Sequence, residues 1–188
     1  MQHATAVVAP AKPRRRALAV ATLIAVVTAL AIAVVLLGAS VLPRVITNLR
    51  TDVLANDTTV SVRAENGGIS VGVPAGWIVS HPFEQDDTVI VRSPDEMLEL
   101  TVTARDEAPD AAYATAAAGA DGLGAPLTET LASGLRIVHS SQGGMLAAGV
   151  GRPGQALAAS IAVRVRDGSL DGYTYTLAKL IDNVGIVP

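Results

Sequence analysis

Two hydrophobic patterns divide the chain. An unbroken run of 26 uncharged, mostly aliphatic residues occupies positions 17–42, whereas beyond residue 58 apolar residues alternate with polar ones or recur every three to four positions. A helix over the run would be about 39 Å long, and the hydrocarbon core of a bilayer is about 30 Å thick. We therefore predict one N-terminal transmembrane helix over residues 17–42. The alternative is a cleavable signal peptide, but its apolar region is typically only about 7–15 residues long.

Alternation with a period of two predicts strands through most of the remaining chain. The segments VSVRA and ISVGV flank the turn residues Glu65-Asn66-Gly67-Gly68 and predict a β-hairpin. A second hairpin is predicted from residues 88–93 and 97–103, in which every second side chain points inward. Further strands are predicted over residues 128–131, 135–141, 145–150 and 159–166.

Two segments have helical character. Residues 110–120 are dense in alanine and begin with Asp110, a favourable residue at a helix start. Residues 170–184 carry apolar side chains at three- and four-residue spacing, which predicts an amphipathic helix that Gly185 ends. Hairpins, a helix, more hairpins and a final helix predict the α+β class, an antiparallel sheet covered by helices and preceded by the transmembrane helix.

The predicted organisation has four parts: a basic cytoplasmic tail at 1–16, the transmembrane helix at 17–42, a linker or stalk at 43–58, and an extracytoplasmic α+β domain at 59–188. Within the linker, Leu49, Val53 and Leu54 have the spacing of a short stalk helix. The 146 residues after the apolar run are enough for one domain with its own core. The chain has no cysteine, so this domain is expected to hold by packing alone.

Charge is distributed unevenly about the apolar run. Lys12, Arg14, Arg15 and Arg16 precede it without any acid, whereas all 17 acidic residues and only ten basic ones follow it. The basic tail predicts a cytoplasmic N-terminus, and the C-terminal domain is then outside. That domain carries about seven net negative charges, which argues against nucleic acid as its partner, because the phosphates would be repelled.

Small residues recur along the predicted transmembrane helix. Ala21, Ala25, Ala29 and Ala33 have the small-xxx-small spacing that allows two helix backbones to approach closely in lipid. We interpret these alanines as a candidate contact for a homo-oligomer or a partner helix. General enrichment in alanine explains the same pattern.

Three segments of the outer part resemble a known family. They are ISVGVPAGW at 69–77, TVIVRSPDEMLELTV at 88–102 and SLDGYTYTLAKLIDNV at 169–184. In local sequence and in order along the chain, they resemble the PsbP-like α/β sandwich domains, including the LpqN-type exported actinobacterial proteins. The resemblance implies an accessory or binding module without shared catalytic residues, so it implies no site residue in this chain.

Two glycine motifs suggest enzymatic sites but lack the structural setting that each needs. Residues 149–154 fit G-x-G-x-x-G, yet the segment after Gln155 alternates as a strand, where a dinucleotide site requires a helix. Ser70 lies in G-x-S-x-G, yet inside a predicted strand and before Pro74. His81 is expected in a loop and His139 at the end of a strand, unpaired with other ligands. We predict no catalytic residue, cofactor or metal.

Acidic residues gather in two predicted loops of the outer domain. The first loop carries Glu84, Asp86 and Asp87, and the second carries Asp95 and Glu96. We interpret them as a solvated acidic surface. If the two loops met in space, their oxygens would suit a cation such as calcium.

Two aromatic residues have predicted positions. Trp77, the only tryptophan, is expected in the core, and Tyr175 is expected on the exposed side of the C-terminal helix.

Together these features predict a non-catalytic binding or accessory module on the outer face of a bacterial cytoplasmic membrane, with an envelope protein or lipid as its partner. The alternatives are an extracytoplasmic hydrolase with an atypical site, or a subunit of a membrane complex for which the anchor is the main contact.

Overall fold

The computed structural model describes residue 32 and residues 51–83 and 85–187. The chain divides into two units, Met1–Val45 and Ile46–Pro188, and the description below concerns the second. The predicted transmembrane helix, with Ala21, Ala25, Ala29 and Ala33, lies outside the described residues apart from Ile32, which is helical. No helix within the described residues has the length and hydropathy needed to cross a bilayer.

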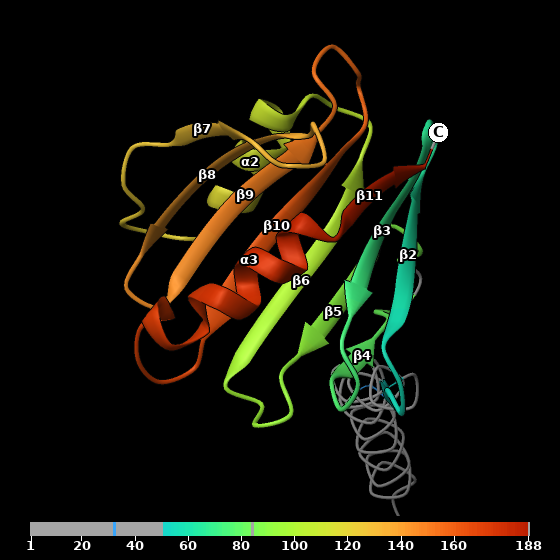
Figure 1. The fold of residues 1–188 in the computed structure, drawn as a ribbon, viewed down its shortest axis with the longest axis vertical. Helices are drawn as coiled ribbons and strands as arrows, with labels where there is room; N and C mark the ends of the chain where they lie inside the picture. The colour runs from blue at the N-terminus through green and yellow to red at the C-terminus, as the bar shows by residue number, and fades with distance from the viewer. Residues whose placement is uncertain (1–31, 33–50, 84, 188) are drawn as a thin grey trace, which may run out of the picture. The chain divides into compact units, whose positions relative to one another are not determined.

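An eight-stranded antiparallel sheet forms the centre of the domain (Figure 1). Its strands lie in the order β1-β4-β5-β6-β10-β9-β8-β7. The bounds are β1 Thr51–Val53, β4 Ile78–Ser80, β5 Thr88–Arg92, β6 Leu98–Arg105, β7 Leu127–Thr130, β8 Arg136–Gln142, β9 Met145–Gly151 and β10 Ala158–Val165. The alternating sequence of β10 pairs over eight residues with β6 and over seven with β9, which makes it the middle of the sheet.

One face of this main sheet is covered by a second sheet and a helix. The second sheet has the order β11-β3-β2, with β2 Thr58–Ala64, β3 Gly67–Val73 and β11 Val184–Val187. Beside it lies α3, Thr174–Asp182, preceded by the 3-10 helix η1, Leu170–Tyr173. Buried aliphatic side chains of both sheets and α3 form one core, among them Ile69, Leu98, Leu100, Ile161 and Leu177. Trp77 is 5% exposed within this core, which confirms its predicted position.

Helix α2, Pro109–Ala117, covers the opposite face of the main sheet (Figure 1). Its buried residues include Ala112 and Ala116, and it packs on β9 and β10, where the facing residues are small. A side chain as short as alanine allows the helix axis to come close to the sheet. The helix predicted for residues 110–120 is therefore present, with its start one residue earlier and its end three residues earlier.

The predicted α+β class is wrong, because strands supply most of the layer that was expected to consist of helices. The described residues form eleven strands in two sheets and only two short α-helices, α2 and α3. The hairpin β2–β3 does not extend the main sheet but pairs with β11, with Val184 opposite Val71 and Ile186 opposite Ile69. Gly185, predicted to end a helix, lies within β11, where a Cβ atom would overlap the Ser70 hydroxyl.

The domain also begins earlier than the predicted boundary at residue 59. Strand β1 pairs with β4, with Thr51 opposite Ser80. Leu54 N–H donates to the Trp77 carbonyl at 2.9 Å, and Gly76 N–H donates to the Leu54 carbonyl at 2.8 Å. The predicted stalk helix through Val53 and Leu54 is therefore wrong. This segment is extended because it pairs with β4 and forms the edge of the main sheet.

Candidate functional site

The layer over the main sheet ends at its last two strands. Helix α3 lies in front of the sheet, and among the described residues no element lies in front of β7 (Figure 1). On β8, Ile137 is 5% exposed on this face, whereas His139 is half-buried and Ser141 is exposed. A groove of about 440 Å³ runs between α3 and strands β7–β9, and we name it the α3 groove. Its floor consists of Glu129, Leu131, Ile137, His139, Ser141 and Leu146. Its wall consists of Leu170, Thr174, Leu177, Ala178, Ile181 and Asp182.

Strand and helix periodicity direct these side chains into the α3 groove. Ile137, His139 and Ser141 are two residues apart in β8, so they leave the strand on the same face of the sheet. On α3, the lining positions follow Thr174 at i+3, i+4 and i+7, which places them on one side of the helix. The α3 groove is therefore formed by regular structure and not by loops.

The α3 groove is mainly aliphatic and partly open to water. Leu131 and Leu146 are half-buried in the floor. Leu127 stands opposite His139 in the β7–β8 pair, so its side chain lies on the same face of the sheet, and it is 59% exposed. Exposed aliphatic side chains that continue a concave apolar surface are typical of a binding site.

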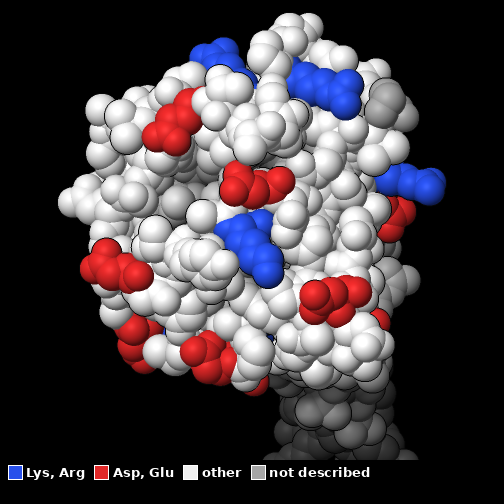
Figure 2. Space-filling model, in the orientation of Figure 1, with Lys and Arg blue, Asp and Glu red and all other residues white. Residues whose placement is uncertain are grey.

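A few polar groups lie along the α3 groove. His139 Nε2 is 3.5 Å from Glu129 Oε1, and this pair is ionic only when His139 is protonated. Asp182 on α3 adds a second carboxylate. Of the described residues that line the α3 groove, none is Lys or Arg. Figure 2, which shows the face that carries α3, has acidic and basic side chains scattered over it without one continuous charged patch.

The polar groups of the α3 groove do not form a nucleophile–base pair. A serine hydrolase needs its base within about 2.6–3.2 Å of the serine hydroxyl. His139 is paired with Glu129, and Ser141 is two positions further along the same strand, where Cα atoms are about 6.6 Å apart. The α3 groove therefore presents a mainly apolar lining, and its histidine is paired with Glu129.

The two acidic loops do not meet. Asp86 and Asp87 precede β5, whereas Asp95 and Glu96 follow it, and the five residues of β5 separate the loops by about 17 Å. Glu84 lies outside the described residues. The described residues contain no group of three or more His, Asp or Glu side chains that could hold a metal ion. The conditional cation site therefore does not assemble from these two loops.

Asp95 instead holds η1 against the β5–β6 turn. Its carboxylate accepts hydrogen bonds from the Ser93 hydroxyl, from the Tyr173 hydroxyl at 2.8 Å and from the Met97 N–H at 3.1 Å. These bonds favour the charged form and lower the pKa of Asp95, with Ser93 the largest cause and Tyr173 the second. Because η1 leads directly into α3, this contact steadies one end of the α3 groove's wall.

Both glycine motifs have structural roles, as the sequence predicted. Residues 149–154 form the end of β9 and the turn into β10, which pairs with β9 from Ala158. A Cβ atom on Gly149 would lie 2.5 Å from Tyr113 N and even closer to the Pro109 carbonyl oxygen, so glycine here allows α2 to approach the sheet. Ser70 lies inside β3, paired with Ser61 and Gly185.

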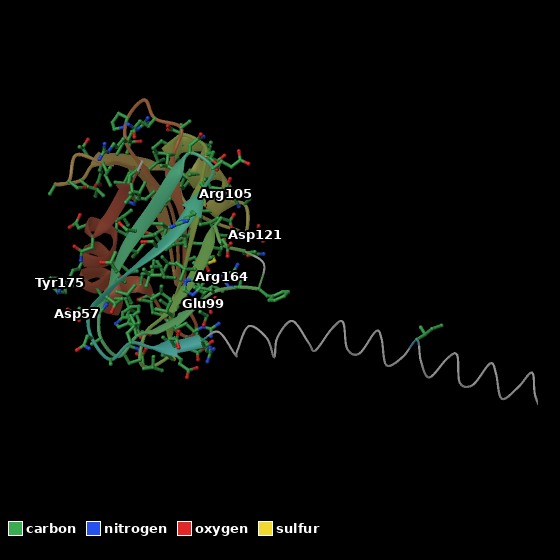
Figure 3. All side chains as sticks on the ribbon, turned by 90° about the vertical axis from the view of Figure 1, so that its right-hand side faces the viewer. Asp57, Glu99, Arg105, Asp121, Arg164 and Tyr175 are labelled. Carbon is green, nitrogen blue, oxygen red and sulfur yellow. The ribbon has the colours of Figure 1, made fainter. Side chains whose placement is uncertain are left out.

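Two further predictions about single residues are confirmed, and one is corrected. His81 lies in a loop, and Tyr175 is 82% exposed and points away from the domain (Figure 3). His139, expected at the end of a strand, lies in the middle of β8. One feature of the sequence indicated that His139 lies in the groove, because residues 137, 139 and 141 are two positions apart and therefore share one face of the predicted strand. Nothing local indicated that α3 would stop beside that face.

A wider depression of about 750 Å³ lies at the other end of the main sheet, next to Arg63 and Arg105. Its lining includes five acidic residues, and one of them, Asp106, accepts the N–H groups of Glu65 and Asn66 at 2.9 Å each. Asp106 therefore closes the β2–β3 turn. The mixed charge and shallow shape of this depression make it a weaker candidate than the α3 groove.

Neither a known protein family, nor a curated protein, nor a solved structure matches this chain. The resemblance to PsbP-like domains therefore stays a prediction.

Proposed function

We propose that this chain is a non-catalytic binding or accessory module, tethered to the outer face of a bacterial cytoplasmic membrane, and that the α3 groove binds an apolar part of another envelope component. One observation carries the proposal. The α3 groove is lined mainly by aliphatic side chains, and its histidine is paired with Glu129 and not with a serine. A binding module needs an apolar lining of this kind. A serine hydrolase would instead need its histidine paired with the nucleophilic serine.

The tether rests on the sequence alone. The 26-residue uncharged run at 17–42 is long enough to span a bilayer, and the four basic residues before it favour a cytoplasmic N-terminus. With this orientation the acidic domain lies outside the cytoplasm. A reporter enzyme fused after Pro188 that is active only in the cytoplasm would contradict the orientation.

The binding role can be tested by site-specific photo-crosslinking in native membranes. A photoreactive residue at position 178 would face the α3 groove, and the same residue at position 175 would sit on the same helix but point to solvent. We expect one defined adduct from position 178 and none from position 175. Equal crosslinking from both positions would contradict specific binding in the α3 groove.

The hydrolase alternative predicts a different result. Purified full-length chain would then cleave an activated ester, and His139→Ala would abolish the cleavage. The complex-subunit alternative predicts that Ala25→Leu or Ala29→Leu removes the partner, whereas Ala178→Trp, which fills the α3 groove, leaves it bound. Our proposal predicts the opposite result: Ala178→Trp removes the partner, whereas Ala25→Leu and Ala29→Leu leave it bound.

A further inference from the structure

The partly covered strip of the main sheet beside α3 has about the width of one helix. Strands β7 and β8 are the last two strands of the sheet, and two strand spacings measure about 10 Å. A helix with its side chains is about 10–12 Å across. In Figure 1, α3 crosses in front of the main sheet and no described element lies in front of β7. On β8, Ile137 is buried on this face, whereas His139 is half-buried and Ser141 is exposed. The partly covered strip beside α3 is therefore wide enough for one more helix.

The length of the uncovered surface is also that of a helix. Strand β8 has seven residues and extends over about 23 Å, which corresponds to a helix of about 15 residues. The apolar side chains Leu127, Leu131 and Leu146 are exposed or half-buried along this surface. An extended strand added to the edge of β7 would cover less of it, because β7 has only four residues and its outer edge lies beyond the groove.

The charge of the α3 groove selects among apolar partners. Glu129 and Asp182 line it, and none of the described lining residues is Lys or Arg. An anionic lipid headgroup or an acidic peptide would be repelled, whereas Lys or Arg side chains beside an apolar stripe would be attracted. The surplus of acidic residues in the chain beyond the apolar run acts in the same direction.

We propose that the α3 groove receives an amphipathic helix of a partner protein, about 10–15 residues long, with an aliphatic stripe flanked by Lys or Arg. This inference rests on the proposed binding function and names the class of its partner. The aliphatic stripe lies on the floor formed by β7–β9 and against α3, as in other cases in which a helix binds in a groove. The basic residues lie beside Glu129 and Asp182.

Three synthetic peptides of about 14 residues and identical length test the proposal on the full-length chain in lipid nanodiscs. The first has leucines at helical spacing and lysines elsewhere, the second has the same composition with leucines at alternate positions, and the third replaces every lysine by glutamate. We expect the first peptide to bind at least about tenfold more tightly than the other two, measured by fluorescence anisotropy. Tighter binding of the alternating peptide would overturn the helix in favour of strand addition.

Variants separate binding in the α3 groove from attraction to an acidic domain. The double variant Glu129→Lys, Asp182→Lys is expected to weaken the first peptide by about tenfold, because both carboxylates lie in the groove. The matched double variant Asp121→Lys, Asp167→Lys changes the net charge equally at exposed positions outside the groove, so we expect less than about a twofold effect. Equal losses in both variants would contradict the proposal.

Filling the groove gives a test that does not depend on charge. Ala178→Trp is expected to abolish binding of the first peptide, whereas Tyr175→Trp on the same helix leaves it unchanged. A dimer of the chain that Ala178→Trp dissociates would show that a second copy occupies the groove, and would overturn the proposal. A defined crosslink from position 178 without affinity for the helical peptide would refute the helix and leave the proposed binding function in place.

Discussion

Replacement of Gly149 by alanine gives the sharpest test of how α2 is packed. The added methyl would lie 2.5 Å from Tyr113 N, 3.0 Å from the Pro109 carbonyl carbon and closer still to its oxygen, whereas ordinary contact begins near 3.4 Å. These atoms are backbone of α2 and cannot rotate away. The whole helix must therefore rise from the sheet by about 1 Å or more, which forfeits about half of the dispersion energy at the interface.

The expected loss of unfolding free energy follows from the interactions that α2 makes when it packs on the sheet. Buried Ala112 and Ala116 each contribute about 0.8 kcal/mol through a methyl group, and the 2.9 Å bond between Tyr113 Oη and Ser140 Oγ contributes about 1 kcal/mol. Together with overpacking, Gly149→Ala is expected to cost about 3 kcal/mol of unfolding free energy. For a domain of this size, that lowers Tm by about 6–12 °C.

Differential scanning calorimetry or urea unfolding of the full-length chain measures this difference. The matched control is Gly124→Ala, because nothing lies within 4 Å of a Cβ atom there, and its effect is expected within about 0.5 kcal/mol. A loss for Gly149→Ala within about 1 kcal/mol of the control would refute the close seating of α2 on β9.

Three further outcomes follow from the structure. Gly185→Ala is expected to cost less than about 1 kcal/mol in urea unfolding, because its added methyl meets only the Ser70 hydroxyl, which can rotate, and Ser70→Gly should remove the cost. Because the folded pKa of Asp95 is lowered, its stabilising contribution is present above the unfolded pKa of about 3.9 and is lost as pH falls through the folded pKa. The stability difference between wild type and Asp95→Asn should therefore shrink below about pH 4, and a pH-independent difference would contradict this account. Leu100→Ala should cost about 2–5 kcal/mol in the same unfolding assay, and Tyr175→Ala should stay within about 0.5 kcal/mol, since these residues are 1% and 82% exposed.

Strand positions could be predicted where one face of a strand is buried. In β10, Ala159, Ile161 and Val163 alternate with more polar residues, and the structure places all three in the core. The hairpins β2–β3, β5–β6 and β8–β9 also follow the predicted segments closely. In each, the turn residues and the period of two indicate the same structure, so the local signal is consistent.

The assignment of strands to sheets could not be predicted, because it depends on distant pairing. Val184 continues the helical spacing of α3, and only the pairing of Val184–Val187 with β3 converts the end of the chain into β11. The same applies to Thr51–Val53, whose pairing with β4 outweighs the helical spacing of Leu49, Val53 and Leu54 in the sequence. A sheet edge offers unsatisfied backbone groups to any nearby segment, and that energy is not encoded locally.

The two faces of the main sheet explain why the α3 groove forms where it does. The face under α2 carries small residues such as Gly149 and Ser160. A short alanine-rich helix can therefore pack close to the sheet and cover this face. The opposite face carries large aliphatic side chains and needs a thicker layer, which the second sheet and α3 supply as far as β9. Beyond α3 the same alternation continues through Ile137, which is 5% exposed, to Leu127, which is 59% exposed. The surface left apolar there follows from the strand pattern itself, and its two carboxylates define the charge that a complementary helix must carry.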